Sequence, residues 1–228
     1  MARSPKPSGR IDNRKRVTGT RNRHRRVLVV TGGVKTEPDY LNYLRSKLGT
    51  TGVTIEIARS GRDPLNLVRR AASLKSEDVI EARRSRDIGN TFDSVWVMTD
   101  VDDFGESVPS AIKEGADADI RVAVSNPCFE IWLVWHIKDQ GYCSTKAIQS
   151  TAVEIGVMSD ANSKEVVLTA LEGNYEIARS RARDRRSAHD RAETVSPDDN
   201  PSSSVDLLVE AFLEAARSAR PGSSPVLT

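Results

Sequence analysis

Acidic residues follow two apolar segments of the chain at the points where those segments end. Glu37 comes a few residues after the first segment, and Asp100 and Asp102 come directly after the second, with Asp103 adjacent. Clustered carboxylates repel one another unless a cation compensates their charge, and Mg²⁺ prefers oxygen ligands of this kind. The pattern therefore predicts a magnesium site in which Asp100 and Asp102 point the same way from an extended chain. The alternative interpretation is that the Asp-rich segment is a solvated turn.

The elements that would position these carboxylates alternate along the chain. Apolar or alternating segments predict strands at residues 26–31, 53–57, 92–98 and 120–124, with helical patterns between them. Such alternation is typical of βαβ units and predicts an α/β fold with a mostly parallel sheet flanked by helices. Sites in open sheets of this class lie outside the carboxyl ends of the strands, so the acidic residues converge if the first and third strands are neighbours.

Two glycines, Gly32 and Gly33, separate the first strand from the first helix, for which Thr36 is the expected N-cap. The segment does not match the Walker A phosphate-binding motif, because valines occupy both of the glycine positions that the motif requires. Backbone N–H groups of the glycines are still suited to a phosphate, which makes Lys35 beside them a candidate substrate-binding residue. The alternative is an ordinary tight turn.

A second group of polar residues follows the fourth predicted strand. The residue before Pro127 is expected to be extended, which would place the amide of Asn126 at the rim of the sheet. Glu130 begins an apolar helix, where an ionised carboxylate needs N–H donors, a cation or a basic partner, or else serves as a helix cap. We take Asn126, Glu130 and His136 as further substrate-binding candidates. His136 does not share a helical face with Glu130, however, and its alternative role is that of a hydrogen-bonded core residue.

The number of cysteines and the hydropathy of the chain indicate the cellular compartment. Cys128 and Cys143 are too few for a disulfide framework or a four-cysteine zinc site, and we expect both to be structural. A nucleophilic pair of Cys128 with His136 would lack a third, orienting group. No apolar run approaches the ~18 residues of a membrane span, and no apolar segment follows the first residues as in a secretory signal. We therefore expect a cytoplasmic protein that makes no membrane contact.

Charge divides the chain of 228 residues unevenly. The first 26 residues hold ten of the 34 Lys and Arg but one of the 32 Asp and Glu. So basic and polar a segment cannot bury a core, which predicts a flexible tail over residues 1–25. It would serve as an arm for phosphate backbones or as a solubilising leader. Strand patterns stop near residue 140, so we expect an α/β domain over 26–140 and a helical region over 141–228.

Arginines gather in the predicted helical region. They are Arg179, Arg181, Arg183, Arg185, Arg186 and Arg191. This stripe is either a solvated face balanced by neighbouring aspartates or a surface for a nucleic-acid backbone.

Four blocks of the chain together resemble the RloB-like family. The blocks are GVKTEPDY at 33–40, VWVMTDVDD at 95–103, SNPCFEIW at 125–132 and NPSSSV at 200–205. The third block is the most specific of them. The resemblance covers residues 26 to about 210, nearly the whole chain.

That family is similar to Toprim-type proteins, so the resemblance implies a Toprim-like fold. Glu37 would then be the general acid/base or a metal ligand, and Asp100 and Asp102 would bind Mg²⁺, with Mn²⁺ as an alternative. Asp103 would be an extra ligand, and Glu130 would add to the acidic pocket. The sequence departs from the family pattern at Val34, where a small or polar residue is expected, which alters the loop but leaves Glu37 in place.

The family occurs beside restriction–modification and abortive-infection genes, and related Toprim effectors cleave nucleic acid, including tRNA. The resemblance thus implies a magnesium-dependent nuclease of antiphage defence that acts on DNA or tRNA. Two other functions stay open. One is a non-catalytic or partner-activated effector subunit held by an ATPase partner protein. The other is an enzyme of phosphoryl or nucleotidyl transfer to a small molecule. A homo-oligomer is compatible with each of the three.

Overall fold

The computed structural model describes residues 25–49, 53–57, 63–87, 90–160, 165–219, 225 and 227. The basic tail predicted over 1–25 lies outside these residues, except for Arg25. Strands and helices follow one another in the order β1 (Val27–Thr31), α1 (Thr36–Leu48), β2 (Val53–Ile57), α2 (Pro64–Arg84), β3 (Ser94–Asp100), η1 (Asp102–Phe104), α3 (Val108–Asp117), β4 (Arg121–Asn126), α4 (Glu130–Ile137), α5 (Thr145–Glu154), η2 (Leu168–Leu171), α6 (Tyr175–Arg191), β5 (Ser202–Ser203) and α7 (Val205–Ala219).

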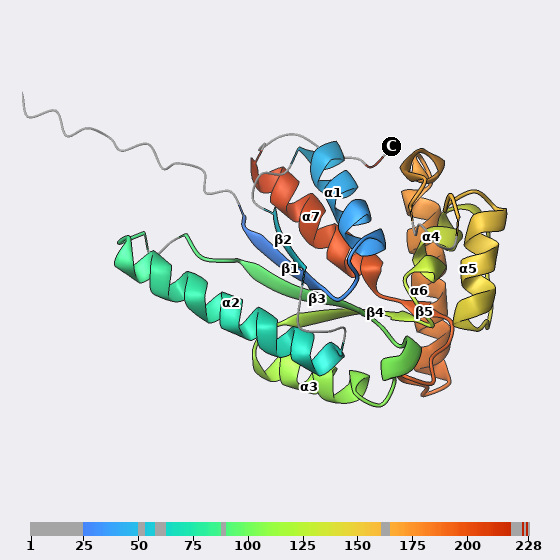
Figure 1. Ribbon diagram of the computed structural model, residues 1–228, viewed down its shortest axis with the longest axis horizontal. Coiled ribbons are helices and arrows are strands. Elements are labelled where there is room, and N and C mark those ends of the chain that lie inside the picture. Colours follow the sequence, from blue (N-terminus) through green and yellow to red (C-terminus); the bar gives the residue numbers. More distant parts are fainter. Residues whose placement is uncertain are drawn as a thin grey trace, which may run out of the picture.

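The strands form one sheet in the order β2-β1-β3-β4-β5 (Figure 1). Strands β1 to β4 run parallel and the two-residue strand β5 pairs antiparallel with β4, which confirms the predicted α/β fold and is compatible with a Toprim-like fold. All four predicted strands are present, although β3 and β4 each end two residues later than predicted. Because β1 and β3 are neighbours, the connections that follow them lie at the same edge of the sheet.

Helices cover both faces of the sheet, because side chains of each strand alternate between two apolar clusters. Val27 and Val29 of β1 pack with residues of α1, α4 and α7, whereas Leu28 and Val30 pack with residues of α2 and α3. Burial on both faces explains why β1 is apolar throughout rather than alternating. Helices α4, α5 and α6 gather beyond the carboxyl ends of the strands (Figure 1).

The C-terminal part of the chain returns to the sheet. Helix α7 contacts α1, β1, β3 and β4, and its buried side chains, such as Leu208 and Phe212, belong to the same cluster as β1. Ser204 makes two hydrogen bonds with the backbone of Val124 in β4. The N–H of Val124 donates to the Oγ of Ser204 at 2.9 Å, and the N–H of Ser204 donates to the carbonyl of Val124 at 3.0 Å. The region after residue 141 thus completes the core that supports the strands. None of the described helices is both long and apolar enough to cross a membrane.

Helix α4 begins at Glu130, as predicted, and is buried from Glu130 to His136, as its apolar sequence leads one to expect. His136 lies within this core, 3% exposed, and its Nδ1 is 2.9 Å from the carbonyl of Trp132. Its ring lies edge-on against Tyr40 and Trp132. Burial, and to a lesser extent the charge of Arg181, lower the pKa of His136 to about 4.

We expect His136 to make the protein sensitive to acid. The unfolded chain takes up a proton on His136 below its usual pKa of 6.5, whereas the native chain does so only near 4. The free energy of unfolding therefore falls as the pH drops through this window, by at most about 3 kcal/mol. Urea unfolding of the wild type and of His136→Gln between pH 7 and 4 tests this. The variant should lose less stability over the window, and equal losses in the two proteins would contradict the assignment.

Candidate carboxylate site

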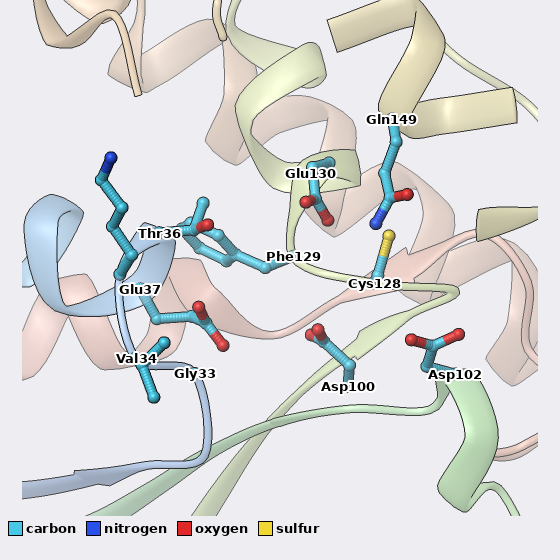
Figure 2. Close-up of a pocket in the computed structure, with 11 residues that line it drawn as sticks. Gly33, Val34, Thr36, Glu37, Asp100, Asp102, Cys128, Phe129, Glu130 and Gln149 are labelled. Atoms are coloured by element: carbon cyan, nitrogen blue, oxygen red, sulfur yellow. The ribbon is translucent and has the colours of Figure 1, made fainter. Parts of the chain in front are cut away.

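Four carboxylates meet beyond the carboxyl ends of β1, β3 and β4 (Figure 2). Glu37 lies in the first turn of α1, Asp100 is the last residue of β3, Asp102 begins η1 and Glu130 begins α4. They line a cavity of about 80 Å³, which is also lined by Gly33, Val34, Lys35, Thr36, Cys128, Phe129 and Gln149. Glu37 and Glu130 are buried, Asp100 is partly buried and Asp102 is exposed.

Gly33 determines where the carboxylate of Glu37 lies. A Cβ atom on Gly33 would overlap with the carboxylate carbon and both carboxylate oxygens of Glu37. The hydroxyl of Thr31 donates to the Gly33 carbonyl at 3.1 Å and so holds the turn. Helix α1 begins at Thr36 with Lys35 in the cap position and without a side-chain cap, so the prediction that Thr36 is the N-cap is wrong by one residue.

Asp100 is the electrostatic centre of the site. Its pKa is raised well above the usual value, mainly by burial, and further by the negative charges of Glu37, Glu130 and Asp102. A hydrogen bond from the backbone N–H of Phe129 partly offsets this by favouring the ionised form. The ionised form of Asp100 is therefore disfavoured, and a proton or a cation beside it would be favoured.

Asp102 is held by contacts from two directions. Its backbone N–H donates to the carbonyl of Pro127 at 2.9 Å, and its Oδ1 accepts a hydrogen bond from the hydroxyl of Thr145 at 3.0 Å. Its φ of +26° is unusual for a residue with a side chain, so these contacts fix a backbone conformation that aspartate rarely adopts. The side chain of the neighbouring Asp103 lies outside the described part of the chain.

Cys128 is a protonated thiol rather than a nucleophile. Burial raises its pKa, and the charges of Glu130 and Asp100 and a hydrogen bond with Glu130 raise it further. Both cysteines are free and buried, in keeping with a structural role.

Two predicted substrate-binding residues do not line the cavity. The amide of Asn126 is buried and donates to the carbonyl of Pro197 and to Asp199, each at 2.8 Å. It is therefore used inside the fold rather than at the rim of the sheet, because a C-terminal loop that the local sequence does not reveal covers it. His136 lies in the core described above. Lys35 and Glu130, in contrast, do line the cavity.

The 200–205 block has a structural role close to the carboxylate site. Asn200 bonds the backbone of Cys143 in both directions, accepting from its N–H at 3.3 Å and donating to its carbonyl at 2.8 Å. Ser203 and Ser125 are joined through their hydroxyls at 3.2 Å. The Asn200 contacts hold the connection from α4 to α5, whereas the bonds of Ser125 and Asn126 hold the end of β4, from which the chain continues to Phe129 and Glu130.

The arginine stripe is largely paired within the fold. Arg181 donates a hydrogen bond to the carbonyl of Trp135. Each terminal nitrogen of Arg186 donates one to an oxygen of the buried Asp206, at 2.7 Å. Arg179 pairs with Glu210 and Arg185 with Asp139. These contacts explain much of the stripe as a means of attaching α6 to its neighbours.

Helix α5 supplies two site residues that the sequence did not indicate. Gln149 lines the cavity, and Thr145 binds Asp102. Their spacing of four residues puts them on one helical face, but no motif links that face to carboxylates that lie on other elements of the chain.

The side chains of the cavity fit Mg²⁺ better than a metal that takes all of its ligands from the protein. Within the described residues, no group of three or more His, Cys, Asp or Glu side chains is arranged to hold a metal ion. Structural zinc sites require four such ligands. Mg²⁺ is usually bound through one or two carboxylates and completes its shell with water and substrate oxygens. Asp100 and Asp102 offer the carboxylates, and the neighbouring negative charge favours a cation.

Fold and site together define an α/β protein with an acidic cavity at the switch point of a mainly parallel sheet. A family model described as RloB-like protein matches residues 27–212, from β1 into α7. The chain therefore belongs to the RloB-like family, as the four sequence blocks indicated. No curated protein and no solved structure matches the chain.

We expect removal of the Asp100 charge to stabilise the protein when no divalent cation is present. Asp100→Asn keeps an acceptor for the Phe129 N–H but relieves the repulsion from the three other carboxylates. Its Tm in EDTA should exceed that of the wild type by about 2–4 °C, the change that ~1 kcal/mol produces in a chain of this size.

The control for this measurement is Asp184→Asn, which removes an exposed carboxylate from α6 and should leave Tm unchanged. Added Mg²⁺ should raise the Tm of the wild type more than that of Asp100→Asn, because a ligand stabilises only the protein that binds it. A lower Tm for Asp100→Asn in EDTA would show that the carboxylates stabilise rather than strain the fold.

Proposed function

We propose that this protein is a magnesium-dependent phosphodiesterase that cleaves nucleic acid, DNA or tRNA, as an effector of antiphage defence. One observation carries the proposal: Glu37, Asp100, Asp102 and Glu130 converge on one cavity at the switch point of the sheet. Sites of α/β folds lie at this place, and clustered carboxylates are the usual means of holding Mg²⁺ beside a phosphate. The defence role rests on the kinship with the RloB-like family.

Each residue has a task in this reaction. Asp100 and Asp102 would hold the metal, which supplies charge stabilisation at the scissile phosphate when it is bound. Glu37, whose carboxylate faces Asp100 across the cavity (Figure 2), holds or transfers a proton for the attacking or leaving oxygen. Lys35 lines the cavity and would offer a positive charge to the phosphate beside the carboxylates.

The dimensions of the cavity favour a polymer over a small molecule. Its volume of about 80 Å³ is well below the ~300–1,000 Å³ of pockets that enclose small ligands. A phosphodiester of a chain that lies across the edge of the sheet needs no such enclosure. The basic tail predicted over residues 1–25 would add phosphate contacts to those of the cavity on such a substrate.

A partner-activated effector is the second candidate function. It is favoured by the lack, among the described residues, of three carboxylates arranged to bind one metal together. A partner such as an ATPase, or the substrate itself, would then complete the site.

A cleavage assay tests the proposal. The purified wild type, Glu37→Gln and Asp100→Asn are each incubated with plasmid DNA, single-stranded DNA and total tRNA in Mg²⁺, Mn²⁺ or EDTA. We expect the wild type to cleave one class of substrate, EDTA to abolish cleavage, and each substitution to slow it by about 10²–10⁴-fold, the usual contribution of an acid–base group. Cleavage that survives both substitutions would refute the site. Cleavage of nothing by the isolated wild type would refute the autonomous nuclease and favour the partner-activated effector.

Gly33→Ala tests the position of Glu37 without changing any polar group. The added methyl group must displace the Glu37 carboxylate, which is the mobile end of its side chain, and the fold can accommodate this cheaply. We expect Tm to change by less than about 2 °C, while cleavage falls by about 10²-fold, since catalysis tolerates little misplacement. The matched control is Gly141→Ala, because nothing lies within 4 Å of a Cβ there. Full activity of Gly33→Ala would mean that the position of Glu37 does not matter for the reaction.

A further inference from the structure

Helix α5 follows β3 and β4 in the chain and lies against the carboxylate site. Thr145 and Gln149 occupy one face of this helix, four residues apart. Thr145 donates to Asp102 at 3.0 Å, and Gln149 lines the same cavity as Asp100 and Glu130. One face of α5 therefore both fixes a carboxylate and forms part of the cavity wall.

The side chain of Gln149 points into the cavity from above Cys128, between Glu130 and Asp102 (Figure 2). Within the described residues, its carboxamide makes no hydrogen bond, and the residue is only half-buried. A carboxamide has two N–H donors and one acceptor oxygen. The hydrogen-bonding capacity of Gln149 is thus directed at whatever enters the cavity.

The chemistry around Gln149 selects an anionic acceptor as its partner. A carboxylate oxygen accepts hydrogen bonds and offers a phosphate oxygen no donor, whereas the Gln149 carboxamide can offer one. An uncharged N–H donor can bind that oxygen without competing with the carboxylates for the metal. We propose that Gln149 donates a hydrogen bond to a non-bridging oxygen of the scissile phosphodiester, an inference that rests on the proposed function. Thr145 is the positioning residue that holds Asp102 beside it.

Binding measurements separate this role from metal binding. The Glu37→Gln chain, which should not cleave, is titrated with fluorescein-labelled tRNA and with labelled single-stranded DNA, in Mg²⁺ and in EDTA. The Mg²⁺-dependent part of the affinity reports the site, whereas binding in EDTA reports other basic parts of the chain. We expect Gln149→Met in this background to weaken the Mg²⁺-dependent affinity about ten-fold or more, as the loss of a hydrogen bond to a charged group does. Binding in EDTA should not change.

Two further measurements define the roles of the residues. Gln149→Met should bind Mn²⁺ alone as tightly as its parent, whereas Thr145→Val should bind it more weakly and Thr145→Ser should restore it. The control is Ser150→Ala, at an exposed neighbour on α5, which should change nothing. If Gln149→Met does not fold, the isosteric Gln149→Glu tests the inference in its place. Its Mg²⁺-dependent affinity for nucleic acid should fall further, because the substitution adds a negative charge.

The outcomes distinguish this inference from the proposed function. Unchanged Mg²⁺-dependent affinity, or unchanged kcat/KM, of Gln149→Met in a protein whose wild type cleaves nucleic acid would overturn the inference alone. Weaker Mn²⁺ binding by Gln149→Met would also overturn it, since Gln149 would then act on the metal. If the wild type neither binds nor cleaves either nucleic acid, the proposed function fails and the inference fails with it.

Discussion

Repulsion among the carboxylates around Asp100 is the constraint that the surrounding structure has to balance. Parallel pairing of β1 with β3 brings the connections after these strands to one edge of the sheet, and the acidic residues come with them. Hydrogen bonds from the Phe129 N–H, the Thr145 hydroxyl and the Cys128 thiol stabilise individual carboxylates. The pKa of Asp100 stays raised in spite of them, mainly because the carboxyl is buried and further because of the neighbouring negative charges.

The supports of the site come from distant parts of the chain. The connection from β4 to α4 delivers Glu130 and the Phe129 N–H. Two residues of the loop before β5 hold its surroundings: Asp199 bonds Asn126 at the end of β4, and Asn200 bonds Cys143 after α4. Helix α4 can carry an ionisable residue at its buried start because α5 and α6 enclose the rest of it in apolar contacts. The C-terminal third is therefore part of the machinery that positions the carboxylates, which agrees with a family match that continues into α7.

Such a site couples stability to function. Like charges held close together reduce the free energy of unfolding, and selection keeps them only where activity requires them. On the proposed function, binding of a cation and then of a phosphate would relieve this repulsion, so that ligand binding would stabilise the fold. On the proposed function, the small cavity would admit one phosphate of a polymer while most of that chain stays outside.

The sequence by itself determined the alternation of strands and helices, the buried nature of β1 and α4, and the acidic residues that follow the strands, because these depend on local periodicity and on the type of each residue. Tertiary structure alone decided that β1 lies beside β3, that Asn126 is covered by the 196–204 loop, and that Gln149 and Thr145 reach the carboxylates. The physical reason is range. Periodicity reports the environment of a segment over a few residues. Each of these contacts instead joins different elements of the fold, and only the packing of the whole chain specifies such a contact.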